Sequence, residues 1–163
     1  MSSQHTARLP SGLRLGNQIK QCEQALLAEK HRVLRPFDLT VPQYAALLML
    51  SETPRISAAR LARQCGVTAQ AMSGLVALLE ERGLIVRTRS EAHAKVLIIE
   101  LTRSGKALLR RADQAAIAVE RRLMDAFPEQ QLSVFREFLD SAIEVLAGEC
   151  PQRPWRSGDS ASV

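Results

Sequence analysis

Aromatic residues are scarce in this chain: they make up 4% of its 163 residues, and the sequence holds only 8 glycines and 7 prolines. Apolar residues still account for 46% of the chain, which is enough to build a core. A core made mainly of Leu, Ala, Ile and Val suits helices, and the few glycines and prolines fall between segments of helical periodicity. The composition therefore predicts a mainly α-helical protein.

Long hydrophobic runs are also missing. No apolar stretch approaches the roughly 18 residues that a membrane span needs, and the polar segment 1–10 has no signal-peptide core. The three cysteines, Cys22, Cys65 and Cys150, are odd in number and far apart, which is typical of reduced thiols. We expect a cytoplasmic protein without a membrane partner.

Patterns typical of enzymes and metal sites are absent as well. The sequence has no CxxC motif, no His and Cys at metal-ligand spacing and no Gly-rich phosphate loop. No two of His5, His31 and His93 lie one helical turn apart, and no Ser or Cys has an obvious base beside it. We therefore expect no catalysis, no cofactor and no metal site.

Basic charge, in contrast, is concentrated in one stretch. The net charge is +5, and residues 55–95 contain seven basic and three acidic residues, so they account for +4 of it. Phosphate contacts release counterions and supply most of the non-specific affinity of proteins for DNA. This segment is therefore the candidate for nucleic-acid binding.

Two short helices separated by a tight turn are predicted within this stretch, over 58–65 and 69–82. Gly66 tolerates the positive φ that the turn needs, and Ala62 supplies the small residue that two steeply crossing helices need where they touch. The expected caps are Ser57 and Gly66 for the first helix, Thr68 and Gly83 for the second, and Thr40 for the preceding helix. This is the pattern of a DNA-reading helix-turn-helix.

Two β-branched or apolar runs follow, over 85–89 and 96–101, with six residues between them. This spacing predicts a hairpin with a polar loop and a basic tip. Leu97, Ile99 and Leu101 alternate onto one face, which we expect to lie on the helices.

Amphipathic helices are predicted on both sides of this central unit. One covers 13–34 and ends before Pro36, one runs from 103 to about 126, and the last begins at Pro128. The apolar stripes of these helices need a partner. Two copies that pack these ends together would place their two DNA-binding units, about residues 40–102 and here called the reading heads, side by side.

The expected fold class is therefore mainly α (α+β), a winged helix-turn-helix with N- and C-terminal dimerisation helices. The expected layout is a flexible N-terminus over 1–12, a main domain over 13–147 and a flexible tail over 148–163. Within the main domain, the DNA-binding winged helix takes about 40–102, and the dimerisation helices take 13–35 and 103–147.

The second helix of the pair would carry the base contacts. We expect the inward face to consist of Met72, Leu75, Val76 and Leu79, which leaves a short and uncharged outer face. Gln70 on that face can form a bidentate pair with adenine, and a long cation at the hairpin tip can enter the minor groove. The candidate contacts to double-stranded DNA are Ser57, Arg60, Arg63, Thr68, Ala69, Gln70, Ser73, Gly74, Arg87, Arg89, His93 and Lys95.

Four strings, in this order and spacing, resemble the MarR family of winged helix-turn-helix transcriptional regulators. They are Leu39-Thr-Val-Pro-Gln-Tyr-Ala-Ala-Leu, Leu61-Ala-Arg-Gln-Cys-Gly-Val-Thr, Leu79-Glu-Glu-Arg-Gly-Leu-Ile and Leu101-Thr-Arg-Ser-Gly. The resemblance covers about 13–147. It implies a triangular homodimer that binds a palindromic operator, most often as a repressor. It also implies release of the operator when a small anionic or phenolic ligand binds near the dimer junction.

The wing departs from the pattern of the family. Relatives usually carry Asp-Arg-Arg before the second strand, whereas this chain has His93, Ala94 and Lys95 there. The ion pair that steadies the wing is thus absent, and Lys95 stands in the place of the minor-groove arginine. Because Lys is a point charge rather than a planar fork, we expect a looser wing and weaker selectivity for A·T-rich DNA. Gly74 also stands where many relatives have Arg.

The resemblance also raises the question of where a ligand would bind. We expect a pocket bounded by the first, second and fifth helices, because an aromatic ring offers a stacking face and an Arg or His can hold a carboxylate. The candidate lining residues are Arg14, His31, Tyr44 and Met49.

Two alternatives stay open. Some relatives sense hydroperoxides through a Cys in the first helix, and Cys22 lies in that helix, although the sensing position corresponds to Lys20 on another face. The other alternative is a helical protein-interaction adaptor without DNA binding, which the uncharged reading face allows.

Overall fold

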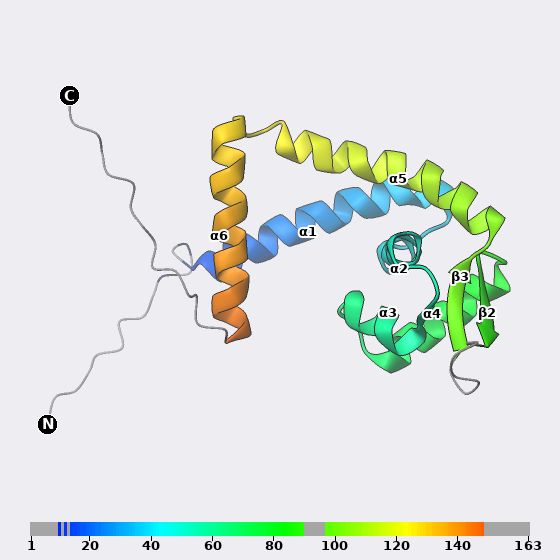
Figure 1. The fold of residues 1–163 in the computed structure, drawn as a ribbon. Helices are drawn as coiled ribbons and strands as arrows, with labels where there is room; N and C mark the ends of the chain where they lie inside the picture. The colour runs from blue at the N-terminus through cyan, green and yellow to red at the C-terminus, as the bar shows by residue number, and fades with distance from the viewer. Residues whose placement is uncertain (1–9, 11, 13, 90–96, 149–163) are drawn as a thin grey trace, which may run out of the picture. The chain divides into compact units, whose positions relative to one another are not determined.

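The computed structural model describes residues 10, 12, 14–89 and 97–148 (Figure 1). In chain order its elements are α1 (Leu15–Leu34), the 3-10 turn η2 (Arg35–Phe37), α2 (Val41–Glu52), β1 (Ile56–Ser57), α3 (Ala58–Gln64), α4 (Ala69–Glu81), β2 (Ile85–Arg89), β3 (Leu97–Leu101), α5 (Arg103–Met124) and α6 (Glu129–Ala147). The predicted hairpin loop and the tail after residue 148 lie outside the described residues. The chain divides into two compact units, residues 1–120 and 121–163, and each is described by itself.

The predicted starts of α2, α3 and α4 are confirmed by hydrogen bonds at their caps, whereas α1 begins at Leu15, two residues later than predicted. At the start of α2 the Gln43 amide N–H donates to Thr40 Oγ1 over 3.3 Å, and the Thr40 N–H donates to Gln43 Oε1 over 3.0 Å. This capping box satisfies two backbone donors at once. Ser57 and Thr68 likewise accept a backbone N–H in the first turn of α3 and of α4.

The sheet has one strand that the sequence analysis missed. The two-residue strand β1 pairs antiparallel with β3, so the strand order is β1-β3-β2. Ser57 both ends this strand and caps α3, and only the cap has a signature in the sequence. The strand extends the short sheet beneath the helix-turn-helix.

The predicted helix-facing side of β3 needs one correction. Ile99 and Leu101 are buried, but Leu97 keeps 48% of its surface exposed. Leu97 pairs with Arg89 at the far end of the β2–β3 ladder, beyond the strand positions that belong to the core. On the opposite face Ile98 is buried instead, between Ser57 and Thr88 of the neighbouring strands.

The core of the first unit is aliphatic, as the composition predicts. Its largest fully buried side chains are Leu34, Leu47, Leu50, Leu61, Met72, Val76, Leu79 and Ile99. The central helix is α2, because it packs against α1, α3, α4 and β3 (Figure 1). The α3–α4 pair therefore packs on α2, which also contacts α1 outside the reading head.

The start of α5 is tied to the end of α4. The Thr102 N–H donates to the Leu84 carbonyl over 3.0 Å, and Thr102 Oγ1 donates to the Gly83 carbonyl over 2.7 Å. Gly105 lies in the first turn of α5, where a Cβ would be 2.0 Å from the Leu84 carbonyl oxygen. Only glycine allows this close approach, which fixes α5 against the turn between α4 and β2.

Each unit leaves large apolar side chains exposed along a helix. They are Leu15, Ile19 and Leu27 on α1, and Phe138, Leu139, Ile143, Val145 and Leu146 on α6. The most exposed is Leu146, at 80%. Within the described part of the chain, no helix combines the length and apolarity that crossing a membrane requires.

Candidate nucleic-acid interface

The orientation of α4 is the one predicted. Met72, Val76 and Leu79 are buried in the core, and Leu75, also predicted to face inward, packs against the core while partly exposed. The outer face consists of exposed Ala69, Gln70, Ser73, Gly74 and Ala77. A Cβ built at Gly74 meets nothing within 4 Å, so the protein itself leaves this part of the surface open. The outer face is therefore narrow and formed by small or short side chains, as a helix inserted into a groove requires.

The turn before α4 is built as its glycine predicts. Gly66 has a φ of 65°, and the Val67 N–H closes the turn on the Ala62 carbonyl over 3.0 Å. Thr68 then accepts the Ala71 N–H over 3.2 Å. Because an accepting hydroxyl keeps its own O–H, Thr68 can still donate to a phosphate or base edge at the start of the helix.

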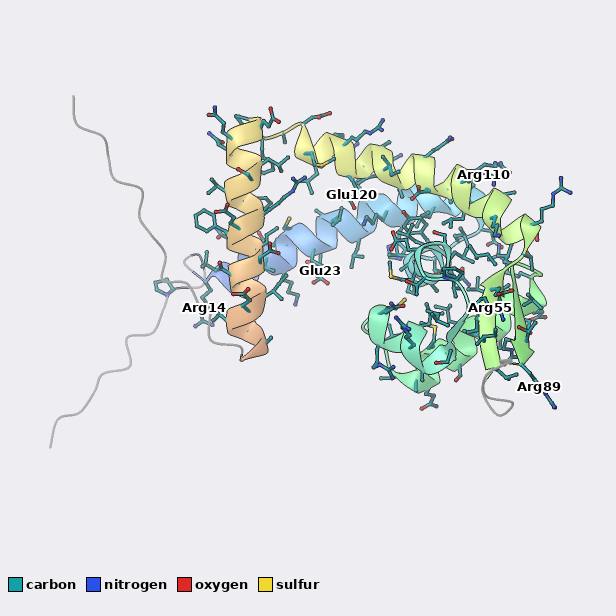
Figure 2. The ribbon with its side chains drawn as sticks, in the orientation of Figure 1. Arg14, Glu23, Arg55, Arg89, Arg110 and Glu120 are labelled. Atoms are coloured by element: carbon teal, nitrogen blue, oxygen red, sulfur yellow. The ribbon has the colours of Figure 1, made fainter. Side chains whose placement is uncertain are left out.

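Exposed arginines lie on two elements that neighbour α4, namely α3 and β2. Arg60 and Arg63 are exposed on α3, and no ion pair engages them in the described part of the chain. Arg89 extends from the last position of β2 (Figure 2). His93 and Lys95 lie outside the described residues. Of the predicted cationic contacts, these three arginines are therefore the ones that the structure presents unpaired.

Arg87 is engaged by another residue of the chain. Its Nε donates to Glu80 Oε2 over 2.8 Å, and its Nη2 bonds the same oxygen. This hydrogen bonding lowers the pKa of the Glu80 carboxyl and raises the pKa of the Arg87 guanidinium. Arg87 can bind a phosphate only by giving up this carboxylate.

A separate groove lies between α2, β3 and α5. Its volume is about 520 Å³, and it is lined by Leu48, Leu50, Ser51, Pro54, Arg55, Glu100, Leu101, Lys106, Leu109, Arg110 and Asp113. Arg55 Nη1 lies 3.1 Å from Glu100 Oε1, whereas Lys106 and Arg110 have no ion pair among the described residues. The groove thus combines an apolar floor with two unneutralised cations one helical turn apart on α5.

The four residues predicted for a ligand pocket do not line this groove. Tyr44 is buried, and its hydroxyl donates to Asp113 Oδ1 over 2.7 Å. Burial and this hydrogen bond raise the pKa of Tyr44 far above its usual value, so the hydroxyl remains a donor. Met49 is half-buried and His31 is exposed. Arg14 lies at the far end of α1 from Arg110 (Figure 2). Of the four, Tyr44 is hydrogen-bonded to a residue of the groove lining, Asp113.

The sequence did contain a signal for the groove cations. Lys106 and Arg110 are four residues apart on a helix, so they share one face next to the inward stripe of α5. What the spacing alone could not show is that α2 and β3 close the other sides. Glu80 was also missed, because its partner lies on a different element.

Comparison with known proteins decides the family. Residues 37–95 match the model of the MarR family. The HTH-type transcriptional repressor Rv2887 of Mycobacterium tuberculosis is 33% identical over 126 residues, which cover 77% of this chain and 91% of that protein. The chain belongs to the MarR family.

Solved structures of other MarR family proteins share the fold. Rv2887 in complex with salicylic acid is 32% identical, with a TM-score of 0.65, over 82% of this chain and 99% of that chain. CouR bound to a 23-mer DNA duplex is 28% identical, with a TM-score of 0.71, over 82% of this chain and 92% of that chain; CouR comes from Rhodococcus jostii RHA1. As a MarR family member, the protein is a DNA-binding transcriptional regulator and not an enzyme.

Cysteines in this MarR family protein differ in their surroundings. Cys65, at the C-terminal end of α3, is half-buried, and burial raises the pKa of its thiol, which disfavours the reactive thiolate. Cys22 is exposed on α1. Tyr44, the only tyrosine of the chain, is bonded to Asp113 rather than to a thiol. Redox sensing through Cys22 stays a hypothesis without structural support.

Proposed function

We propose that this MarR family protein is a repressor that binds a palindromic operator as a homodimer and releases it when a small anionic ligand binds. The outward face of α4 carries the proposal. This face is exposed, narrow and flanked by unpaired arginines on α3 and β2. The major groove, about 12 Å wide, admits a helix of this kind.

Base contacts and phosphate contacts would come from different elements. Gln70 on α4 offers the amide that pairs with adenine N6 and N7, while Arg60 and Arg63 on α3 face the phosphates beside the groove. Because the reading face has no charge, phosphate contacts and groove shape would supply much of the affinity.

The exposed apolar residues of α1 and α6 support the homodimer. Burying apolar surface is favourable by about 25 cal/mol per Å², and side chains such as Ile143 and Leu146 are mostly exposed in a single chain. A two-fold pairing of these helices would bury them and present two α4 helices to one duplex. Half-sites of a palindromic operator would then lie roughly 10 base pairs, or one helical turn, apart.

The groove between α2, β3 and α5 supports a small anionic ligand. Lys106 and Arg110, which have no ion pair within the described part of the chain, can bind a carboxylate, while Leu101 and Leu109 offer an apolar surface to a ring. Rv2887, whose structure contains salicylic acid, is a relative with this kind of ligand. Since α2 also packs against the reading head, a ligand that favours another placement of α2 would change how the two heads fit the DNA.

Salicylate is the probe that tests this proposal. We expect the protein to shift a duplex containing the DNA that flanks its own gene, and millimolar salicylate to reduce that binding and raise the Tm of the free protein. Arg110→Ala should abolish both effects of salicylate while leaving binding without salicylate intact. Arg103→Ala is the matched control, because Arg103 is exposed on the same helix but does not line the groove. If both variants respond to salicylate like the original protein, the groove is not the ligand site.

A further inference from the structure

We propose that Glu80 limits the affinity of the protein for DNA of any sequence, because its carboxylate occupies the Arg87 guanidinium that would otherwise bind a phosphate. This inference rests on DNA binding through α4. It assigns to Glu80 the role of limiting the sequence-independent part of the affinity without touching a base.

The strand register places Arg87 beside α4. Arg87 pairs with Ile99 across β2 and β3, and directly opposed residues of an antiparallel pair share one face of the sheet. Ile99 is fully buried under the helices. The Arg87 side chain therefore lies on the helix-facing side of the edge strand, where Glu80 in the last turn of α4 meets it.

The course of a bound duplex brings a phosphate strand to the same place. With α4 in the major groove and Arg89, at the end of β2, in the neighbouring minor groove, one sugar-phosphate strand would cross between them. Arg87 lies two positions before Arg89 on β2, and its side chain meets Glu80 in the last turn of α4, so it lies where the two elements adjoin. The Arg87 side chain is 40% exposed and the Glu80 side chain 34%, so both can be reached from solvent.

The ion pair is not what holds α4 on β2. Leu79 and Ile85, the buried neighbours of the pair on the two elements, already pack into the common core. Exposed ion pairs add little to stability. The main effect of Glu80 is therefore electrostatic. Its carboxylate neutralises the Arg87 guanidinium and accepts the hydrogen bonds that this guanidinium could otherwise donate to a phosphate.

Fewer free cations mean less binding to random DNA. Non-specific affinity rises with the number of phosphates that a protein neutralises, whereas base contacts add affinity only at the operator. The outer face of α4 offers only a few short polar groups, so phosphate contacts supply a large share of the affinity, and one contact more or less changes that affinity measurably.

The test is the salt dependence of binding to a random duplex, measured by fluorescence anisotropy. Glu80→Gln keeps the size of the side chain but releases Arg87. It should steepen the slope of log K against log salt by about 0.9 and raise affinity about fivefold to tenfold at 0.1 M salt, as one added phosphate contact does. Adding Arg87→Gln in the same chain should remove this gain.

Glu81→Gln is the matched control, because it removes the same charge one position along and has no ion pair among the described residues. It should leave the slope near that of the original protein. Thermal melting shows whether each variant folds. A second variant, Arg87→Lys, keeps the positive charge but replaces the forked guanidinium with a single ammonium group, which binds Glu80 less firmly. It should therefore steepen the slope as well, by a smaller amount than Glu80→Gln.

Two results would overturn the proposal. One is an unchanged slope for both Glu80→Gln and Arg87→Lys in folded protein; the other is an equal change for Glu80→Gln and Glu81→Gln, which would reflect net charge alone. Failure of the original protein to bind any duplex at low salt is a different result, because it would refute DNA binding itself.

Discussion

Single side chains of the reading head divide into those that recognise bases and those that hold phosphates. Gln70→Ala should cost about 1–3 kcal/mol of binding free energy at certain operator positions and leave binding to random DNA unchanged. Arg60→Ala should weaken binding to both and lower the salt slope by about one unit. Anisotropy titrations with operator and random duplexes measure both effects. Equal losses for the two variants on random DNA would mean that their roles are assigned wrongly.

At the residue scale the sequence predicted local interactions and missed distant ones. Thr40, Ser57 and Thr68 cap helices through backbone groups a few positions away, so their spacing in the chain is a sufficient signal. The bond from Tyr44 to Asp113 joins residues 69 positions apart and depends on how α2 packs on α5. No local pattern encodes such a pair, so the sequence placed Tyr44 in a ligand pocket without its acidic partner.

The junction between α4, β2 and α5 fixes the reading head to the remaining helices of its unit. Because a Cβ at residue 105 would clash with the Leu84 carbonyl at 2.0 Å, Gly105→Ala should destabilise the fold. We expect a loss of about 1–3 kcal/mol in the free energy of unfolding, as for other overpacked sites. Urea denaturation measures it, with Gly16→Ala as the control, since a Cβ at residue 16 meets nothing within 4 Å. Equal stability of the two variants would show that α5 is not held at this junction.

At the element scale the helices and the hairpin followed from periodicity and caps, and the departures have simple causes. β1 is too short for its own alternation, and Ser57 carries the stronger signal of a helix cap. Leu97 has the alternation of a buried residue but pairs with Arg89 at the last position of the β2–β3 ladder, outside the core. The groove belongs to α2, β3 and α5 together, so it depends on packing that a pattern within one element cannot show.

At the scale of the whole molecule, the exposed stripes of α1 and α6 are the feature that a single chain does not explain. Ile143→Asp places a charge on the apolar side of α6 and should yield monomers in sedimentation velocity. Operator affinity should fall about a hundredfold or more, because the second reading head loses its effective concentration. Ser141→Asp, at an exposed polar position nearby, should remain dimeric. A dimeric Ile143→Asp protein would place the interface elsewhere.

Chemical footprinting with dimethyl sulfate tests most directly whether α4 enters the major groove. The reagent methylates guanine N7 in the major groove and adenine N3 in the minor groove, so it distinguishes the two sides of a base pair. With the operator bound, we expect two clusters of protected guanine N7 atoms roughly 10 base pairs apart, both lost in the Ile143→Asp monomer. Unprotected guanine N7 atoms throughout a duplex that the protein demonstrably binds would contradict the account.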